Sequence, residues 1–144
     1  MGRKYARESA MKLLYQMEIN SDFSESAIEI FLDNFNFDYG ETMYIENVIE
    51  TIIENLDTVD KYIGNNIEGW EINRLAKVDL SILRIAIYEM LYRTDIPVQV
   101  SINEAIEISK KYSTEESSRF INGILGGFVR SGVLEDYGNK TTKG

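Results

Sequence analysis

The sequence predicts an all-α protein made of two packed three-helix bundles. Apolar residues recur at the three- and four-residue spacing of helices along most of the chain. Between Val78 and Leu91 they cover far more than one stripe, which predicts a helix that neighbours surround on most sides. Two motifs typical of capping boxes, at 101–104 and 113–116, predict the starts of two further helices. The segment 78–91 is therefore expected to be the central helix of the core.

The first helix is expected at about 4–20, because its apolar residues fall at positions i, i+4, i+7, i+8 and i+11. At about 100° per residue, Tyr15 projects nearly opposite this apolar stripe. An aromatic ring among charged residues on a solvent-exposed face differs from an aromatic residue of the core. The side of the helix that carries Tyr15 also carries Lys4, Arg7, Glu8 and Lys12.

The middle of the chain predicts two more amphipathic helices, at 24–37 and at 42–63, with a turn at 37–40 between them. Glycine and asparagine residues after residue 63 then interrupt the pattern. We therefore expect an N-terminal three-helix subdomain at 1–64 and a C-terminal helical subdomain at 65–134. The polar residues 135–144 are expected to form a flexible tail.

Composition excludes several classes of chemistry. The sequence has neither cysteine nor histidine, so disulfides, thiol nucleophiles, Ser-His-Asp triads and zinc sites built on Cys or His are excluded. No carboxylate spacing indicates a metal site, and we expect neither a cofactor nor enzymatic activity. The sequence holds no apolar run long enough to span a membrane and no secretory signal, which predicts a cytoplasmic protein.

Charge is distributed unevenly. The formal net charge is −9, which on its own disfavours nucleic acid as a partner. Residues 1–12, however, contain four cationic side chains and one acidic one, whereas residues 13–60 contain twelve acidic side chains and no Lys or Arg. Because charges are screened over about 8 Å at physiological salt, a polyanion at the basic end is little affected by the distant acidic surface.

Two clusters of basic and aromatic residues are candidate RNA-binding sites. Cations that neutralise phosphates and aromatic rings that stack on bases are the means by which single-stranded nucleic acid is held. The alternative for the first helix is that its cations are merely solvated and Tyr15 packs on a neighbouring helix. In the second cluster, the helix dipole explains the lysines and core packing explains the aromatic residues. This second cluster consists of Lys110, Lys111, Tyr112, Arg119 and Phe120.

The sequence also carries separated motifs that resemble the NusB family of bacterial transcription antitermination factors. Leu14-Tyr15 and an opening motif match, and so do four later segments. The resemblance extends from Arg3 to about Phe128. In chain order, the matching segments read RKYARESA, LRIAIYE, DIP, VSINEAIE and FINGIL.

This resemblance implies a non-enzymatic protein that binds the boxA element of ribosomal RNA leader transcripts. It implies as partner the small-subunit ribosomal protein ten (NusE), within an antitermination complex on RNA polymerase. The family's RNA-binding residues correspond to Arg3, Lys4, Arg7, Tyr15, Lys110, Tyr112, Glu116 and Phe120 of this chain. The protein-partner positions are expected to be Tyr15 and Asp79, and the sequence does not decide whether the chain self-associates. The alternative function is a helical protein–protein adaptor without RNA contact.

Overall fold

The computed structural model describes residues 2–137, apart from the side chain of Trp70, and the regular elements among these residues are all helices. The all-α prediction is thereby confirmed. The α-helices are α1 (Arg3–Asn20), α2 (Glu25–Asn34), α3 (Tyr39–Glu54), α4 (Leu56–Gly64), α5 (Lys77–Tyr92), α6 (Val98–Tyr112) and α7 (Glu115–Arg130). Short 3-10 helices are η1 (Glu68–Trp70), η2 (Ile72–Arg74) and η3 (Val133–Tyr137).

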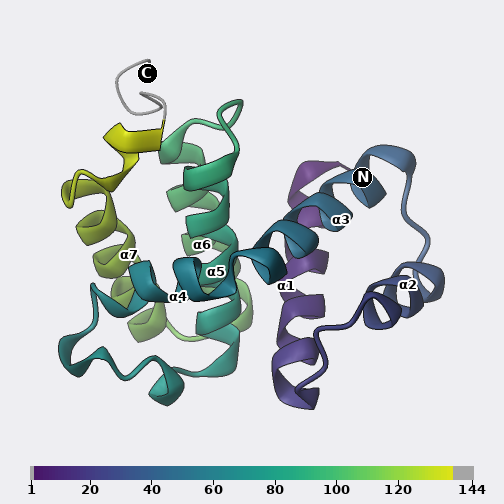
Figure 1. Ribbon diagram of the computed structural model, residues 1–144, viewed down its shortest axis with the longest axis horizontal. Helices are drawn as coiled ribbons and strands as arrows, with labels where there is room; N and C mark the ends of the chain where they lie inside the picture. Colours follow the sequence, from purple (N-terminus) through teal and green to yellow (C-terminus); the bar gives the residue numbers. More distant parts are fainter. Residues whose placement is uncertain (1, 138–144) are drawn as a thin grey trace.

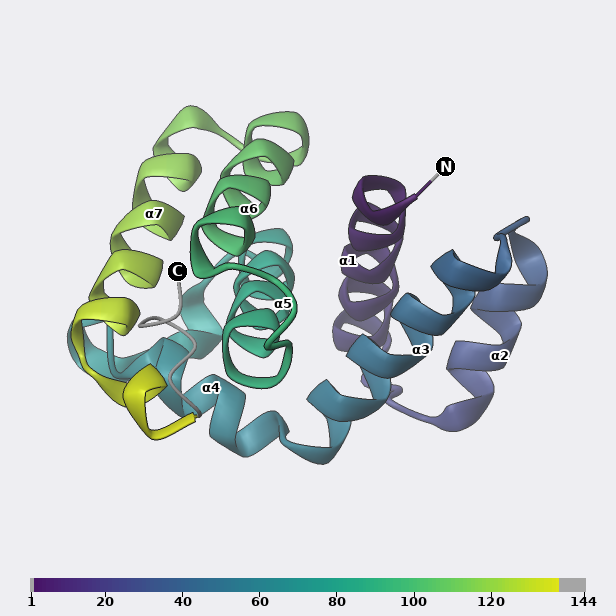
Figure 2. The ribbon, with the colours of Figure 1, turned by 90° about the horizontal axis from the view of Figure 1, so that it is seen from above.

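The helices lie in two groups, α1 to α3 and α4 to α7 (Figure 1). Helix α5 packs against α4, α6 and α7 of its own group and also against α1 and α3 of the other. Seen from above, α1 is the helix of the first group on the side of α5 and α6 (Figure 2). The contact of α1 and α3 with α5 therefore joins the two groups.

Helix α5 is the central helix that the sequence predicts. All its residues from Asp79 to Leu91 are buried, which agrees with an apolar surface that covers most sides of the helix. The buried stretch also includes two charged residues, Arg84 and Glu89. Buried charges require partners, and both residues have them on neighbouring helices.

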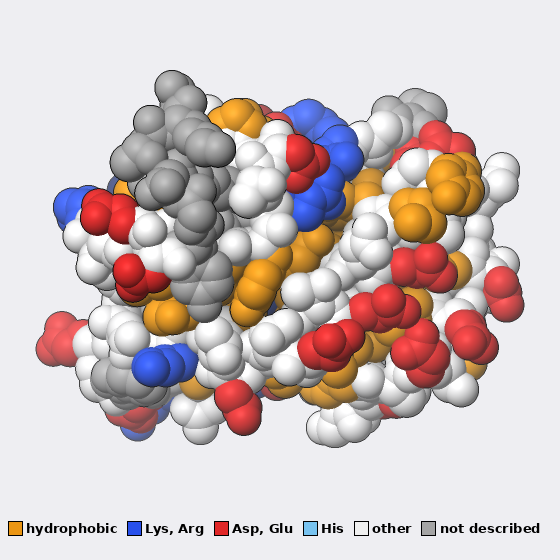
Figure 3. Space-filling view, turned by 45° about the horizontal axis from the view of Figure 1, so that its top comes forward, with side chains coloured by type: hydrophobic (Ala, Val, Ile, Leu, Met, Phe, Trp, Pro, Cys, Tyr) orange, Lys and Arg blue, Asp and Glu red, His pale blue; other side chains and the backbone are white. Residues whose placement is uncertain are grey.

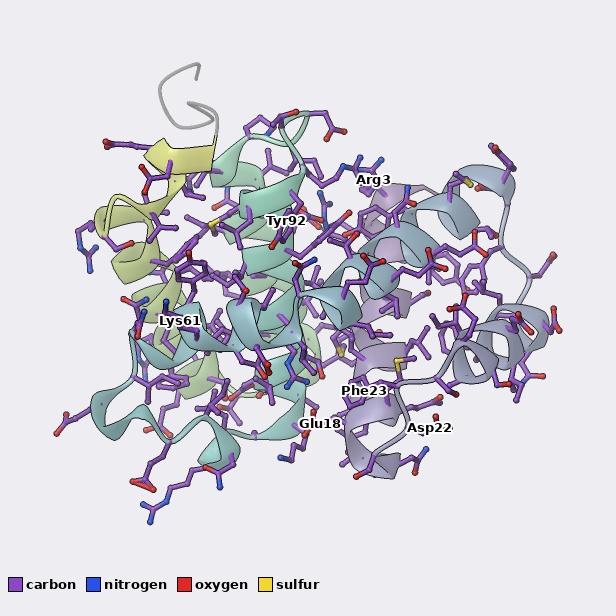
Figure 4. All side chains as sticks on the ribbon, in the orientation of Figure 1. Arg3, Glu18, Asp22, Phe23, Lys61 and Tyr92 are labelled. Atoms are coloured by element: carbon purple, nitrogen blue, oxygen red, sulfur yellow. The ribbon has the colours of Figure 1, made fainter. Side chains whose placement is uncertain are left out.

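Arg84 connects three helices through its guanidinium group. Its Nε and Nη2 donate to the carboxylate of Asp60 in α4 at 2.9 and 2.8 Å, and its Nη1 donates to Glu18 in α1 at 2.7 Å. Burial alone raises the pKa of Glu18, but the hydrogen bond and charge of Arg84 outweigh it, so the pKa lies below its usual value. Glu18 and Arg3 mark opposite ends of α1 (Figure 4).

The predicted single helix at 42–63 is wrong, because the chain breaks at Asn55 into α3 and α4. The side-chain amide of Asn55 donates to the carbonyl oxygen of Thr51 at 2.8 Å, a local bond that competes with helix continuation. After the break, α4 packs against α5 and α7, whereas α3 packs against α1. The division of the chain at 64/65 stays a prediction, and the packing of α4 favours a change of group at Asn55.

Both predicted capping boxes are wrong in detail. Helix α6 begins at Val98, so Ser101 lies inside it and donates to Glu89 at 2.8 Å. The cap of α7 is Thr114, whose hydroxyl accepts from the backbone of Ser117. A complete capping box begins α3 instead, between Asp38 and Glu41.

The C-terminal end of the described chain is helical. Residues 135–137, which were expected to belong to a flexible tail, continue the 3-10 helix Val133–Tyr137, and Leu134 is buried in the core. The rest of that predicted tail, 138–144, lies outside the described residues. Within the part of the chain that the structure describes, no helix has the length and apolar character needed to cross a membrane.

Candidate nucleic-acid interface

One face of α1 is open to solvent, as the helical spacing predicts. Lys4 and Lys12 are exposed, and the Tyr15 side chain is 38% exposed. Glu8 is half-buried between the two lysines along the same face. This face therefore presents cationic and aromatic groups at the surface.

The prediction that Arg7 lies on this exposed face is wrong. Arg7 is only 6% exposed, and its Nε donates to Glu89 of α5 at 2.7 Å. The reason is that α1 packs against both α3 and α5, so its buried face is wider than the apolar stripe alone. Glu89 also accepts hydrogen bonds from Tyr44 of α3 and Ser101 of α6, and it thereby holds four helices together.

The environment of Glu89 shifts the pKa values of Arg7 and Tyr44. Burial pushes the pKa of Arg7 down, but the hydrogen bond and charge of Glu89 outweigh burial, and the net pKa is raised. Burial and the adjacent carboxylate of Glu89 hold the pKa of Tyr44 well above its ordinary value. Arg7 is therefore charged and Tyr44 neutral at physiological pH.

Helix α6 brings the second basic and aromatic cluster against α1. Lys111 Nζ and the Tyr112 hydroxyl both donate to Oε1 of Glu8, each at 2.9 Å. The Nζ atom of Lys12 lies 5.2 Å from the centre of the Tyr112 ring, close enough for a cation–π interaction. Residues about a hundred positions apart in the sequence thus share one surface.

The pKa of Glu8 reflects this position. Its partial burial favours the neutral acid, but hydrogen bonds from Lys111 and Tyr112 and the charges of Lys111 and Lys12 outweigh burial, so the pKa is lowered. In return, the hydrogen bond to Glu8 raises the pKa of Lys111. The carboxylate and the ammonium group are therefore both charged at neutral pH.

A surface cleft runs between α1 and α6, and we call it the α1–α6 cleft. Two further ion pairs border it: Lys4 lies 3.4 Å from Glu104, and Lys110 lies 4.0 Å from Glu107. The cleft is thus basic in its lysines and partly neutralised by neighbouring carboxylates. Its lining residues are Lys4, Glu8, Glu107, Ile108, Lys110 and Lys111.

The remaining predicted RNA-binding residues lie farther along the chain, at the start of α7. Glu116, Arg119 and Phe120 are all exposed, and the Phe120 ring is 38% exposed. No hydrogen bond or ion pair within residues 2–137 connects these side chains to the cleft. These three residues therefore lie on the exposed first turns of α7, which follows Tyr112 in the chain.

Asp79 is not the surface acid that contact with a basic partner protein requires. It is 5% exposed, and its two carboxylate oxygens accept hydrogen bonds from Ser113 at 3.0 Å and Ser117 at 2.9 Å. It lies in the first turn of α5 and fixes the connection between α6 and α7. Its carboxylate is thus used inside the fold, and the assignment of Asp79 to the protein partner stays a prediction.

Sequence reasoning missed Arg93, which the fold places near Arg3. Both guanidinium groups lie over the Tyr44 ring, that of Arg3 at 4.7 Å and that of Arg93 at 5.8 Å from its centre. Arg93 also forms a two-bond pair with Asp95, which holds the pKa of Asp95 at about 2. No spacing signal links positions 3 and 93, because only the packing of α1 and α5 against α3 brings both to Tyr44.

The charged surface is divided between the two halves of the molecule. Figure 3 shows acidic side chains gathered over the half that holds α2 and α3, with a patch of Lys and Arg at the border with the other half. Among residues 2–137, no three His, Cys, Asp or Glu side chains are grouped so that they could hold a metal ion. The separation of acidic from basic side chains suits the surface to electrostatic binding.

The fold and the cleft define a helical protein with a basic, aromatic surface of the kind that holds nucleic-acid phosphates and bases. A model of the NusB family matches residues 4–130, and the chain belongs to this family. Relatives called transcription antitermination protein NusB include one from Acetivibrio thermocellus, 46% identical with 97% of both chains covered. Another, from Thermoanaerobacter pseudethanolicus, is 50% identical, with 94% of this chain and 96% of the relative covered.

Solved structures show the same fold. The T. maritima NusB structure has a TM-score of 0.82 at 38% identity, covering 90% of this chain and 92% of that one. A structure of antitermination factors NusB and NusE in complex with double-stranded RNA has a TM-score of 0.77 at 22% identity, covering 90% of this chain and 96% of that one. The second likeness concerns the fold alone.

Proposed function

We propose that this chain is a non-enzymatic, cytoplasmic RNA-binding factor for transcription antitermination. It binds boxA RNA of ribosomal RNA leader transcripts together with small-subunit ribosomal protein ten (NusE), as part of an antitermination complex on RNA polymerase. Membership of the NusB family and the names of the relatives support this proposal. The observation that carries it is the contact of α6 with α1, where Lys111 and Tyr112 meet Glu8 and Lys12.

The binding mode follows from the exposed groups. Lys4, Lys12, Lys110 and Lys111 supply charge for phosphates, and Tyr15 supplies a ring on which a base can stack. Arg3 extends the basic surface at the N-terminal end of α1 (Figure 4). Toward the other end, the RNA continues over Glu116, Arg119 and Phe120 at the start of α7.

Two residues named by the resemblance receive different roles in this proposal. Arg7 supports the site by fixing α1 to α5 and does not contact RNA, because its guanidinium is buried against Glu89. Asp79 likewise acts inside the fold, through Ser113 and Ser117. Tyr15 remains the proposed contact for the ribosomal protein as well as for RNA.

RNA titration of charge variants tests the proposal. Replacing Lys4, Lys12 and Lys111 by Gln removes two cations that line the cleft and the neighbouring Lys12, and affinity for single-stranded boxA RNA should fall at least tenfold at low salt. With about four phosphate contacts, the wild-type slope of log affinity against log salt should be near −3, and the triple variant should approach −1.

A matched variant controls for net charge. Lys61→Gln, Arg74→Gln and Arg130→Gln remove three exposed cations elsewhere. Lys61 lies on α4, which does not line the α1–α6 cleft (Figure 4). This control should bind RNA within about twofold of wild type, because distant charges are screened. Equal losses in both triple variants would argue against a site in the α1–α6 cleft.

A helical adaptor without RNA contact is the second candidate, and the acidic surface of α3 favours it. Burial and the neighbouring carboxylates of Glu25, Glu46 and Glu54 raise the pKa of Glu50, as expected where negative charges crowd together. Such a surface suits a basic protein. Titrating the ribosomal protein with and without RNA separates the two functions: binding of the protein alone, with no RNA binding in either arrangement, would favour the adaptor.

A further inference from the structure

Glu8 is an anion that lines the α1–α6 cleft, which we propose to bind a polyanion. Its side chain is 14% exposed, and its Oε1 accepts from both Lys111 and Tyr112. The proposed function assigns Lys111 to RNA, and the family resemblance assigns Tyr112 to RNA as well. In the free protein, they are therefore already bound to a negatively charged oxygen.

The contacts of Glu8 have the chemistry of a phosphate contact. A lysine ammonium and a tyrosine hydroxyl converge on one anionic oxygen at ordinary hydrogen-bonding distances. A phosphate oxygen of RNA is an acceptor of the same kind. The carboxylate and a phosphate therefore compete for Lys111 and Tyr112.

Glu8 differs from the other carboxylates of the cleft. Glu107 also pairs with a lysine of the cleft, but at 4.0 Å, with both side chains 59% exposed, a geometry that contributes little. Glu8 has two donors and greater burial, and its lowered pKa keeps it charged. Of the acids that line the cleft, Glu8 is held most firmly.

The position of Glu8 on α1 also provides a place for it after displacement. Lys12 lies four residues farther along the same face, and a Glu followed by Lys at this spacing is a favourable helical pair. The charge of Lys12 already acts on Glu8. A carboxylate released by Lys111 and Tyr112 therefore need not lose all cationic partners.

We infer that Glu8 is an internal competitor of RNA phosphate, which holds Lys111 and Tyr112 in the free protein and releases them when RNA binds. Glu8 thereby limits the affinity of the cleft for RNA, because a phosphate has to displace the carboxylate from Lys111 and Tyr112. This inference rests on the proposed function, since it assigns a role within the same cleft. It predicts that removing the charge of Glu8 strengthens RNA binding.

The experiment compares Glu8→Gln with Glu107→Gln in the full chain. Both substitutions remove one negative charge from the cleft and retain the side-chain shape. Glu8→Gln should tighten binding of single-stranded boxA RNA by about three- to tenfold and make the salt slope steeper by about 0.7. Glu107→Gln should tighten binding by less than about twofold, because its pair with Lys110 is exposed.

Each outcome is decisive. Tighter binding of Glu8→Gln beyond that of Glu107→Gln supports the inference, provided that thermal melting shows both variants folded. Equal gains in RNA affinity in the two variants would show an effect of net charge alone. Weaker RNA binding by Glu8→Gln would show that Glu8 positions Lys111 and Tyr112 for RNA. Either result overturns the inference. If the Lys4, Lys12 and Lys111 variant loses RNA while Glu8→Gln gains nothing, the inference fails and the proposed function stands. If that lysine variant binds as wild type does, or wild type and Glu8→Gln bind no RNA, both fail.

Discussion

Arg7 and Glu8 are neighbours on α1, and each forms an ion pair with a different helix. Arg7 pairs with Glu89 of α5, and the two side chains are 7% and 1% exposed. Glu8 pairs with Lys111 of α6, whose side chain is 60% exposed. The first pair lies in the core and the second at the surface, although Arg7 and Glu8 are adjacent in the sequence.

The two pairs differ in burial, and burial decides whether a pair contributes mainly to stability or mainly to ligand binding. A buried pair has lost its hydration, so removing one member leaves an uncompensated charge. An exposed pair stays hydrated and contributes little to stability, but its groups remain accessible to a ligand. The buried pair should therefore control stability, whereas the exposed pair should control RNA affinity.

The largest effect is expected from Glu89→Ala. This substitution leaves the buried Arg7 without its carboxylate and also removes the acceptor of Tyr44 and Ser101. We expect a loss of about 3–5 kcal/mol in the free energy of unfolding, measured by urea denaturation. Arg74→Ala, which breaks the exposed pair with Glu71, is the control and should cost less than about 1 kcal/mol. Comparable losses in the two variants would contradict the assignment of the Arg7–Glu89 pair to the core.

A smaller effect is expected from Tyr44→Phe, which removes one hydrogen bond to Glu89. The cost should be about 1.5 kcal/mol, because the acceptor is charged but keeps Arg7 and Ser101. The pKa of Tyr44 is raised in the folded state, so its contribution is complete below the unfolded value near 10 and is lost as pH rises through the folded value. Wild type should therefore lose more stability above pH 10 than Tyr44→Phe does. Parallel pH profiles for the two proteins would refute this role of the hydroxyl.

The smallest stability effect is expected from Lys111→Gln. The ammonium is exposed, so the melting temperature should change by less than about 2 °C, while affinity for RNA falls severalfold. The Glu8 pKa is lowered in the folded state, so its contribution is present above the ordinary value of 4.5 and declines as pH falls through the folded value. The loss of stability on acidification should therefore be smaller in Lys111→Gln than in the wild type. A large drop in melting temperature with unchanged RNA affinity would contradict the assignment of the Glu8–Lys111 pair to RNA binding.

The sequence predicts the helices well where burial alone decides them. The apolar stretch of α5 identifies the central helix, because a helix that is apolar on most sides can only be stable when surrounded. The sequence misleads at Ser101, whose hydroxyl bonds Glu89 across a helix contact instead of capping a helix start. Local spacing carries no information about a partner that lies on another helix. The break at Asn55 has a different cause. One weak helix former does not end an apolar pattern by itself, so the pattern predicts a continuous helix across Asn55.

The candidate site could be predicted in part. The exposed positions of Lys4, Lys12 and Tyr15 follow from helical spacing. The burial of Arg7 does not, because it depends on α3 and α5 both packing against α1 and on Glu89 being placed opposite it. The meeting of α1 with Lys111 and Tyr112 is likewise a tertiary contact, so the sequence suggested two clusters without showing their adjacency.

Lysine footprinting tests the central claim most directly. The protein, free and with saturating boxA RNA, is acetylated and the modification of each lysine is measured by mass spectrometry. We expect RNA to protect Lys4, Lys12, Lys110 and Lys111 and to leave Lys61 on α4 as reactive as before. Protection of Lys61 with unchanged reactivity of Lys4, Lys12, Lys110 and Lys111 would contradict RNA binding between α1 and α6.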